Sequence, residues 1–119
     1  MTKAEALYKF YNSFGIPAYP NSNVPDDVIF PYLIYEPYIA NNGNELSPAI
    51  NLYCYTDSEA QPNDLADKIS KAIGQGISIK TDDGAMYIYH NTGWQPIVDN
   101  TNSAIKRRYT TLSIVFNTF

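Results

Sequence analysis

The sequence contains few of the residues that most often carry chemistry. Its 119 residues include one cysteine, Cys54, and one histidine, His90. A single cysteine excludes an internal disulfide, a CxxC redox pair and a thiol-rich metal site. Any catalytic pair or metal site that needs an imidazole has to use His90. We therefore expect packing, and not cross-links, to stabilise the fold.

Long hydrophobic runs and positive charge are also scarce. No stretch approaches the roughly 18 consecutive apolar residues of a membrane helix. The first ten residues, MTKAEALYKF, are amphipathic and lack the apolar segment of a signal peptide. We therefore expect a protein that is made and kept in the cytoplasm and has no membrane partner. The formal net charge of -4 argues against tight nucleic-acid binding, because that affinity comes mainly from lysine and arginine.

The chain is, however, long enough to form one hydrophobic core, and it contains an unusual number of tyrosines. With 45% hydrophobic and 17% charged residues, the 119 residues are typical of one globular domain, which we place at 1–119. Many of the eleven tyrosines alternate along predicted strands. Tyrosine joins a large apolar ring to a polar tip, so it suits a surface that becomes buried against a partner.

Two segments have the pattern of amphipathic helices. Thr2 can cap the first, Glu5 can complete a capping box, and Gly15 ends it. The second begins between Ser58 and Pro62 and ends at Gly74. The residues predicted to face inward are Ala4, Leu7, Tyr11 and Phe14 in the first helix, and Leu65, Ile69, Ala72 and Ile73 in the second.

Runs rich in aromatic and β-branched residues predict five or six strands. They begin with PYLIYEPYI at 31–39, whose prolines place it at a sheet edge or end it near Pro37. The others cover 49–56, 77–81, 85–90, 94–98 and 109–119. The order of elements is typical of an α+β domain with a mostly antiparallel sheet and two helices packed on one face. The other face would then carry tyrosine, threonine and asparagine.

The segments between these strands have the composition of turns and loops. Residues 16–30 are dense in proline, asparagine and aspartate, which predicts a long loop. Asp82 to Gly84 and Asn91 to Gly93 predict tight turns in which the glycines allow positive φ.

For each residue that could act in catalysis or bind a metal, a structural role fits the sequence better than a functional one. His90 has no nucleophile or acid nearby in a recognisable motif, and Cys54 lies in an apolar strand. Asp82 and Asp83, with Asp57, could suggest a cation site, but two aspartates before a glycine are typical of a hairpin turn. No glycine-rich phosphate loop precedes a helix. We therefore expect no enzyme activity, no metal and no cofactor.

The one cluster of like charge, Lys106-Arg107-Arg108, has two interpretations. Long basic side chains can protect an exposed edge strand from pairing with another sheet. Alternatively, the cluster contacts an acidic segment of another subunit, because complementary charge sets partner choice at interfaces. The candidate interface residues are Lys106, Arg107, Arg108, Tyr53 and Tyr55, together with the acidic pairs Asp26 and Asp27, and Asp82 and Asp83.

Taken in order, these segments resemble the tail terminator proteins of siphophages, also called tail completion or head-tail joining proteins. The resemblance covers residues 3–119 and lies in the order and texture of PYLIYEPYI, INLYCYT, LADKISKAIG and IKRRYTTLSIVF. The short hairpins predicted near Asp82 and Thr92 depart from the family pattern. The resemblance implies a hexameric ring in the virion neck that caps the tail tube and then joins the tail to the head. Its implied partners are copies of itself, the tail tube protein and a head completion or connector protein.

Three alternatives stay open at this point. The chain could be another neck or head-tail connector component of the same machine. It could instead be a monomeric module whose tyrosines form an aromatic platform for a sugar or peptide. A small hydrolase or transferase using His90 would need a deep pocket that encloses the imidazole beside an acid.

Overall fold

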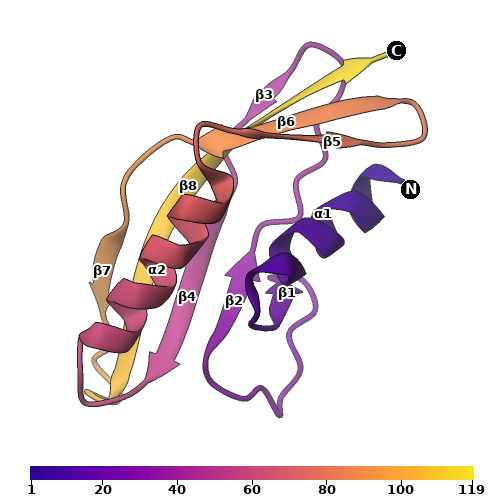
Figure 1. The fold of residues 1–119 in the computed structure, drawn as a ribbon. Coiled ribbons are helices and arrows are strands. Elements are labelled where there is room, and N and C mark those ends of the chain that lie inside the picture. Colours follow the sequence, from indigo (N-terminus) through magenta and orange to yellow (C-terminus); the bar gives the residue numbers. More distant parts are fainter.

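A single long strand, β8 (Ile105–Thr118), organises the fold. The computed structural model describes residues 1–119 and places β8 at the centre of an eight-stranded sheet with the order β1-β2-β4-β8-β6-β5. Two further strands, β3 and β7, also pair with β8 (Figure 1). Because β8 is 14 residues long, different strands pair with its two halves, and the sheet consists of two half-sheets that share it.

The first half-sheet forms around residues 105–111 of β8. On one edge β8 pairs with β4 (Ala49–Tyr55), which pairs with β2 (Tyr32–Tyr35), and on the other edge it pairs with β7 (Gln95–Val98). These pairs are antiparallel, whereas β1 (Ala18–Pro20) lies parallel to β2.

The second half-sheet forms around residues 112–118 of β8. There β8 pairs with β6 (Gly84–His90) on one edge and with β3 (Glu45–Leu46) on the other, and β5 (Ile77–Lys80) pairs with β6. The N-terminus, the C-terminus and the β5–β6 turn lie at this end of the molecule (Figure 1). Backbone hydrogen bonds from Asp82 to Met1 and from Phe119 to Asp83 connect them.

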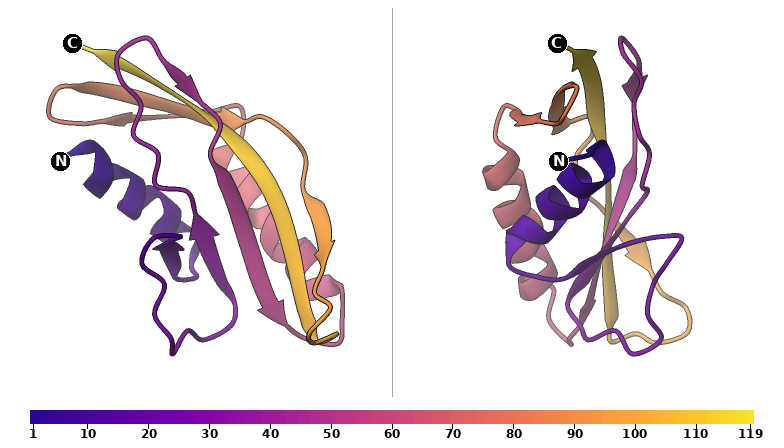
Figure 2. Two further views of the ribbon diagram at one scale, coloured as in Figure 1. Left: turned by 180° about the vertical axis from the view of Figure 1, so that it is seen from behind. Right: turned by 90° about the vertical axis from the view of Figure 1, so that its right-hand side faces the viewer.

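Two helices cover one face of the sheet. In α1 (Lys3–Tyr11) the predicted capping box forms between Thr2 and Glu5, and a 3-10 turn, η1 (Asn12–Phe14), leads to Gly15 at φ 88°. The longer helix α2 (Ala60–Ile73) ends at Gly74. Both lie on the same side of the surface formed by β2, β4 and β8 (Figure 2).

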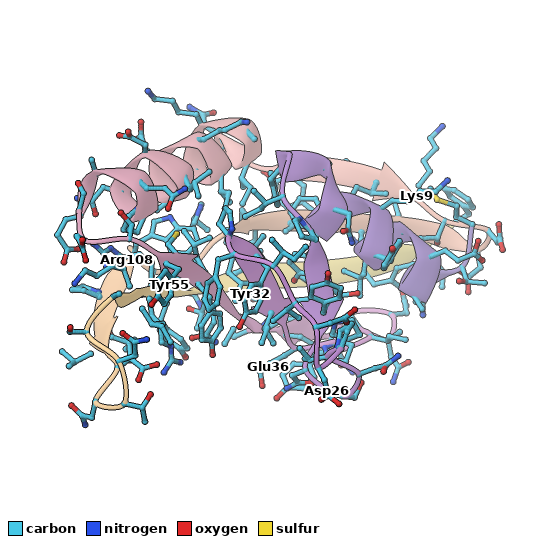
Figure 3. All side chains as sticks on the ribbon, turned by 90° about the horizontal axis from the view of Figure 1, so that it is seen from below. Lys9, Asp26, Tyr32, Glu36, Tyr55 and Arg108 are labelled. Carbon is cyan, nitrogen blue, oxygen red and sulfur yellow. The ribbon has the colours of Figure 1, made fainter.

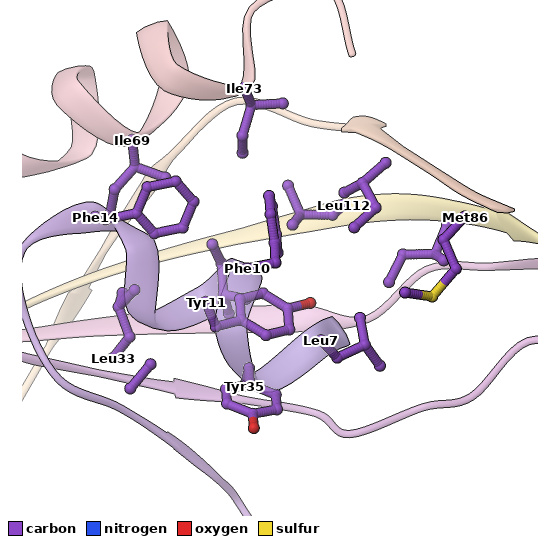
Figure 4. Close-up of a cluster of buried hydrophobic side chains, with 14 of the residues drawn as sticks. Leu7, Phe10, Tyr11, Phe14, Leu33, Tyr35, Ile69, Ile73, Met86 and Leu112 are labelled. Carbon is purple, nitrogen blue, oxygen red and sulfur yellow. The ribbon is translucent and has the colours of Figure 1, made fainter. Parts of the chain in front are cut away.

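The core fills the space between these helices and the sheet (Figure 4). Tyr11 of α1 stacks on Tyr35 of β2, with ring centroids 4.1 Å apart. Burial of such side chains is the main favourable contribution to folding. The other labelled core residues are Leu7, Phe10, Phe14, Leu33, Ile69, Ile73, Met86 and Leu112.

The predicted fold class is therefore confirmed: the chain is an α+β domain with a mostly antiparallel sheet and two helices on one face. The predicted pair of strands around 31–39 and 49–56 is present as β2 and β4. Neither helix is both long and apolar enough to cross a lipid bilayer.

Several local predictions are wrong. The predicted loop 16–30 contains β1, so β2 is not an edge strand, although it ends at Tyr35, near Pro37, as the other interpretation of the prolines predicted. The last strand begins at Ile105, four residues before the predicted start. Residues 91–93 do not form a hairpin turn, because β6 and β7 both pair with β8 and not with each other.

Two further details also differ from the sequence-based expectation. Neither Gly84 nor Gly93 has a positive φ. Ala4 and Ala72 are exposed, while Ala6 and Ala66 take the inward positions on their helices.

Candidate functional site on the outer face of the sheet

The face of the first half-sheet that points away from the helices, here called the outer face, carries most of the predicted site. Side chains alternate between the two faces of a strand. In β4, Ile50, Leu52 and Cys54 are fully buried on the helix side. Asn51, Tyr53 and Tyr55 therefore lie on the outer face, opposite Tyr109, Arg107 and Ile105 of β8.

Four aromatic side chains form one continuous group on this face, here called the outer aromatic cluster. Tyr32 and Tyr53 are directly paired across β2 and β4, and their rings stack at 5.0 Å with an angle of 6°. Phe30 lies 5.2 Å from Tyr32 and 5.6 Å from Tyr55, so it joins the two tyrosines. Tyr55 remains 57% exposed. The cluster thus presents apolar ring surface with phenolic tips.

Arg107 adds a positive charge to the outer aromatic cluster. Its guanidinium lies 4.8 Å from the ring centroid of Tyr53, a cation–π geometry. Its Nη2 donates to Oδ1 of Asn51 at 3.2 Å, whereas the buried Nε has no hydrogen-bond partner. Arg107 forms no ion pair within the chain. Asp99 is near enough for Arg107 to contribute to its lowered pKa, although the main cause there is a hydrogen bond from Thr101.

The other two members of the basic cluster face the helix side. Arg108 is buried and donates from Nε and Nη2 to Asn63 at 3.2 and 3.0 Å, and from Nη2 to Glu59. The hydrogen bond from Arg108 is the main cause of the lowered pKa of Glu59. Lys106 donates to the carbonyl of Ser103 at 2.7 Å. These two side chains join β8 and the segment before it to the start of α2.

This arrangement excludes one of the two interpretations of the basic cluster. Edge protection is wrong, because β8 is paired along both edges at these positions. The alternation of the strand separates Arg107 from Lys106 and Arg108, so only Arg107 is placed beside Tyr53 and Tyr55.

The two predicted acidic pairs lie at different ends of the molecule. Asp26 and Asp27 are exposed in the loop between β1 and β2 and have no hydrogen-bond or ion-pair partner. Figure 3 shows Asp26 and Glu36 on the side of the sheet away from both helices. Asp82 instead binds the N-terminal amine at 2.5 Å, and Asp83 accepts from Thr81 at 3.2 Å.

His90 and Cys54 both have structural surroundings. Trp94 donates from Nε1 to Oγ of Ser70 at 2.8 Å, and the same oxygen lies 3.2 Å from Nε2 of His90. Burial lowers the pKa of His90. His90 lines none of the four surface pockets. Cys54 is fully buried in the core, and burial raises the pKa of its thiol to about 11.

One pocket lies between β7, β8 and the residue before α2. Its ten lining residues include Ile97, Ile105 and Arg107, the helix-side residues Glu59, Lys106 and Arg108, and Asp99. None of the four pockets is lined by a member of the outer aromatic cluster. The cluster is therefore a surface that is not hollowed.

The sequence-based prediction missed Phe30 and Tyr32 as site residues. Phe30 follows a loop-like segment, and the position of Tyr32 beside Tyr53 depends on the register of β2 against β4. The available signal was the alternation of PYLIY, which puts Tyr32 and Ile34 on the face opposite Leu33 and Tyr35.

Comparison with protein-family models and with curated proteins finds no match to this chain.

Proposed function

We propose that this chain is a structural subunit that associates with copies of itself into a closed ring and acts without bond chemistry. The observation that carries the proposal is the outer aromatic cluster with Arg107, which lies on the face that neither helix covers and in which Tyr55 is 57% exposed. Aromatic residues and arginine are the residue types enriched at protein interfaces.

Large apolar side chains at the margins of the first half-sheet support the same conclusion. Ile29, next to the cluster, is 79% exposed, and Val98 of β7 is 81% exposed. Exposed apolar surface next to polar residues commonly marks a contact with another protein. A ring requires that one patch meets a different patch of the next copy, and the two margins of this half-sheet differ in composition.

The role that the sequence resemblance implies is a neck component that caps the tail tube and joins tail to head. A net charge of -4 suits that role, because a passage for DNA works better if it repels phosphate than if it retains it. The same surfaces would serve another neck or connector component, which differs in its partner and not in its mode of assembly.

The alternative of a monomeric aromatic platform is less well supported. A sugar or peptide module usually holds its ligand in a cleft lined by aromatic side chains. The outer aromatic cluster lines no pocket, so its surface fits an extended protein contact better than a small ligand.

The direct test is the absolute mass in solution, measured by light scattering from micromolar to millimolar concentration. We expect the mass to rise with concentration toward six times the 13.4 kDa of one chain. A chain that stays monomeric throughout and binds a glycan or peptide array would instead be a binding module. Tail tubes without their terminal ring, taken from the phage or prophage that encodes the chain, should bind the assembled ring at one end in electron micrographs.

A further inference from the structure

Two groups of opposite charge on the outer side of the molecule form no ion pair within the chain. Arg107 uses only one of its five N–H donors within the chain, toward Asn51, and forms no ion pair. Asp26 and Asp27 are exposed and also form none. The chain therefore carries a cation and an acidic loop that are complementary but do not meet.

These groups lie toward opposite margins of the first half-sheet. The acidic loop connects β1 to β2 at one margin, whereas Arg107 belongs to β8, which lies beyond β4 and next to β7 at the other. β7 pairs with β8 alone, so its outer edge is free. A second copy placed alongside could bring its acidic loop to Arg107 without displacing any strand.

The surroundings of the two groups also match in polarity. The pocket beside Arg107 has Ile97 and Ile105 in its lining, and the three cations Lys106, Arg107 and Arg108 outnumber the two carboxylates Glu59 and Asp99 there. In the loop, Ile29 follows Asp27 by two residues and is 79% exposed. A pocket that combines cations with apolar side chains fits a segment that combines a carboxylate with an aliphatic side chain.

We propose that Arg107 and the pocket beside it bind the loop 24–29 of a second copy of this chain, with Asp26 and Asp27 facing the guanidinium. This contact rests on the proposed function, because it names the two surfaces through which successive copies associate. The patches are different, so the contact is head-to-tail and repeats from copy to copy.

Asp82 and Asp83 are not part of this contact. Asp82 is occupied by the N-terminal amine and Asp83 by Thr81. They lie at the other end of β8, where Phe119 donates its backbone N–H to Asp83. Twelve residues of extended strand separate Phe119 from Arg107, which corresponds to a distance of up to about 40 Å.

The test uses one variant for each side of the contact. Arg107→Glu removes the cation, and Asp26→Lys combined with Asp27→Lys reverses the loop. The matched controls lie at exposed positions on the helix side. Lys9→Glu is the control for Arg107→Glu. Asp64→Lys combined with Asp67→Lys is the control for the loop variant. We expect each contact variant to raise the dissociation constant of assembly by about 30-fold or more, and each control to leave it within about threefold.

Mixing the two contact variants gives a signature specific to a head-to-tail contact. The Arg107→Glu copy keeps an intact loop and the loop-reversed copy keeps an intact Arg107. An equimolar mixture should therefore assemble with the two variants alternating and in equal numbers in native mass spectrometry, because the intact loop faces Arg107 in one contact and the reversed loop faces the introduced glutamate in the next. Combining all three substitutions in one chain should restore assembly, because the charges are then exchanged. Thermal unfolding of each variant shows whether it folds, and Arg107→Gln, which removes the charge but keeps a long polar side chain, serves if Arg107→Glu does not fold.

The outcomes separate this contact from the proposed function. If the wild-type chain assembles and the contact variants assemble equally well, the contact is wrong and self-association stands. A mixture that assembles no better than either contact variant alone would also overturn it. If the wild-type chain stays monomeric at millimolar concentration, both the contact and the self-associating function are refuted.

Discussion

Two glycines that look alike in the sequence should respond in opposite ways to alanine. Gly84 and Gly93 each end a segment with the composition of a tight turn, which predicts positive φ for both. Neither has it in the structure. Gly84 is buried where β6 meets the end of β8, whereas a Cβ atom on Gly93 would contact nothing within 4 Å.

The structure sets the size of the two effects. A Cβ atom on Gly84 would overlap the carbonyl oxygen of Asn117 and lie 2.9 Å from Cα of Thr118. Both are backbone atoms of the central strand, so β6 has to shift. Overpacking of this kind costs about 3 kcal/mol. Alanine at Gly93 should stabilise the fold by about 0.4–1 kcal/mol, because it restricts the unfolded chain.

Thermal unfolding followed by circular dichroism measures both effects. An unfolding entropy of about 2.1 cal/mol/K per residue gives about 250 cal/mol/K for 119 residues. Each kcal/mol then shifts Tm by about 4 °C. We expect Gly84→Ala to lower Tm by about 12 °C and Gly93→Ala to raise it by about 2–4 °C. Equal losses of about 4 °C in both variants would indicate two positive-φ turn glycines and would refute the described register of β6 against β8.

Three further predictions concern the helix side of the sheet. The pKa of Glu59 is lowered by its hydrogen bond from Arg108, so the pair stabilises the fold at neutral pH and this contribution is lost as pH falls through the folded-state pKa. The Tm difference between wild type and Glu59→Gln should therefore shrink on acidification, and a constant difference would contradict the ion pair. Leu112 is fully buried, and Leu112→Ala should cost about 2–5 kcal/mol, or about 8–20 °C in Tm, whereas a loss below about 4 °C would place it outside the core. Because burial raises the pKa of Cys54 to about 11, an aromatic disulfide reagent should label the thiol slowly in the folded protein and rapidly in denaturant, and equal rates would show that the thiol is accessible.

Elements with local signals are predictable from the sequence. Thr2 and Glu5 define the start of α1 by contacts three residues apart, and Gly74 ends α2. In β4, the alternation of apolar and polar residues is enough to separate Leu52 and Cys54 from Tyr53 and Tyr55. These signals need only neighbours along the chain.

The start of β8 is not predictable in the same way, because its partners are distant in the sequence. A strand segment beginning Lys106-Arg107-Arg108 lacks apolar alternation, and a buried arginine is costly unless it is paired. Glu59 and Asn63, which lie 49 and 45 residues away from Arg108, supply that pairing. Only the packing of α2 on the sheet brings them together.

The candidate site is likewise only partly predictable from the sequence. Composition and charge point to Tyr53, Tyr55 and Arg107, and the structure places them together on the outer face. Neither signal points to Phe30 or Tyr32, since their stacking depends on the register between β2 and β4. Whether this surface binds another copy is a separate question that solution experiments decide.

The central claim is that another copy of this chain covers the outer face when the protein assembles. Hydroxyl-radical footprinting read by mass spectrometry tests it directly, with Tyr55 and Tyr8 compared across protein concentration. Both side chains are similarly exposed in the single chain, at 57% and 55%, but Tyr8 belongs to α1 on the helix side. We expect oxidation of Tyr55 to fall as the mass rises while oxidation of Tyr8 stays constant. Unchanged oxidation of Tyr55 in assembled protein would contradict the claim.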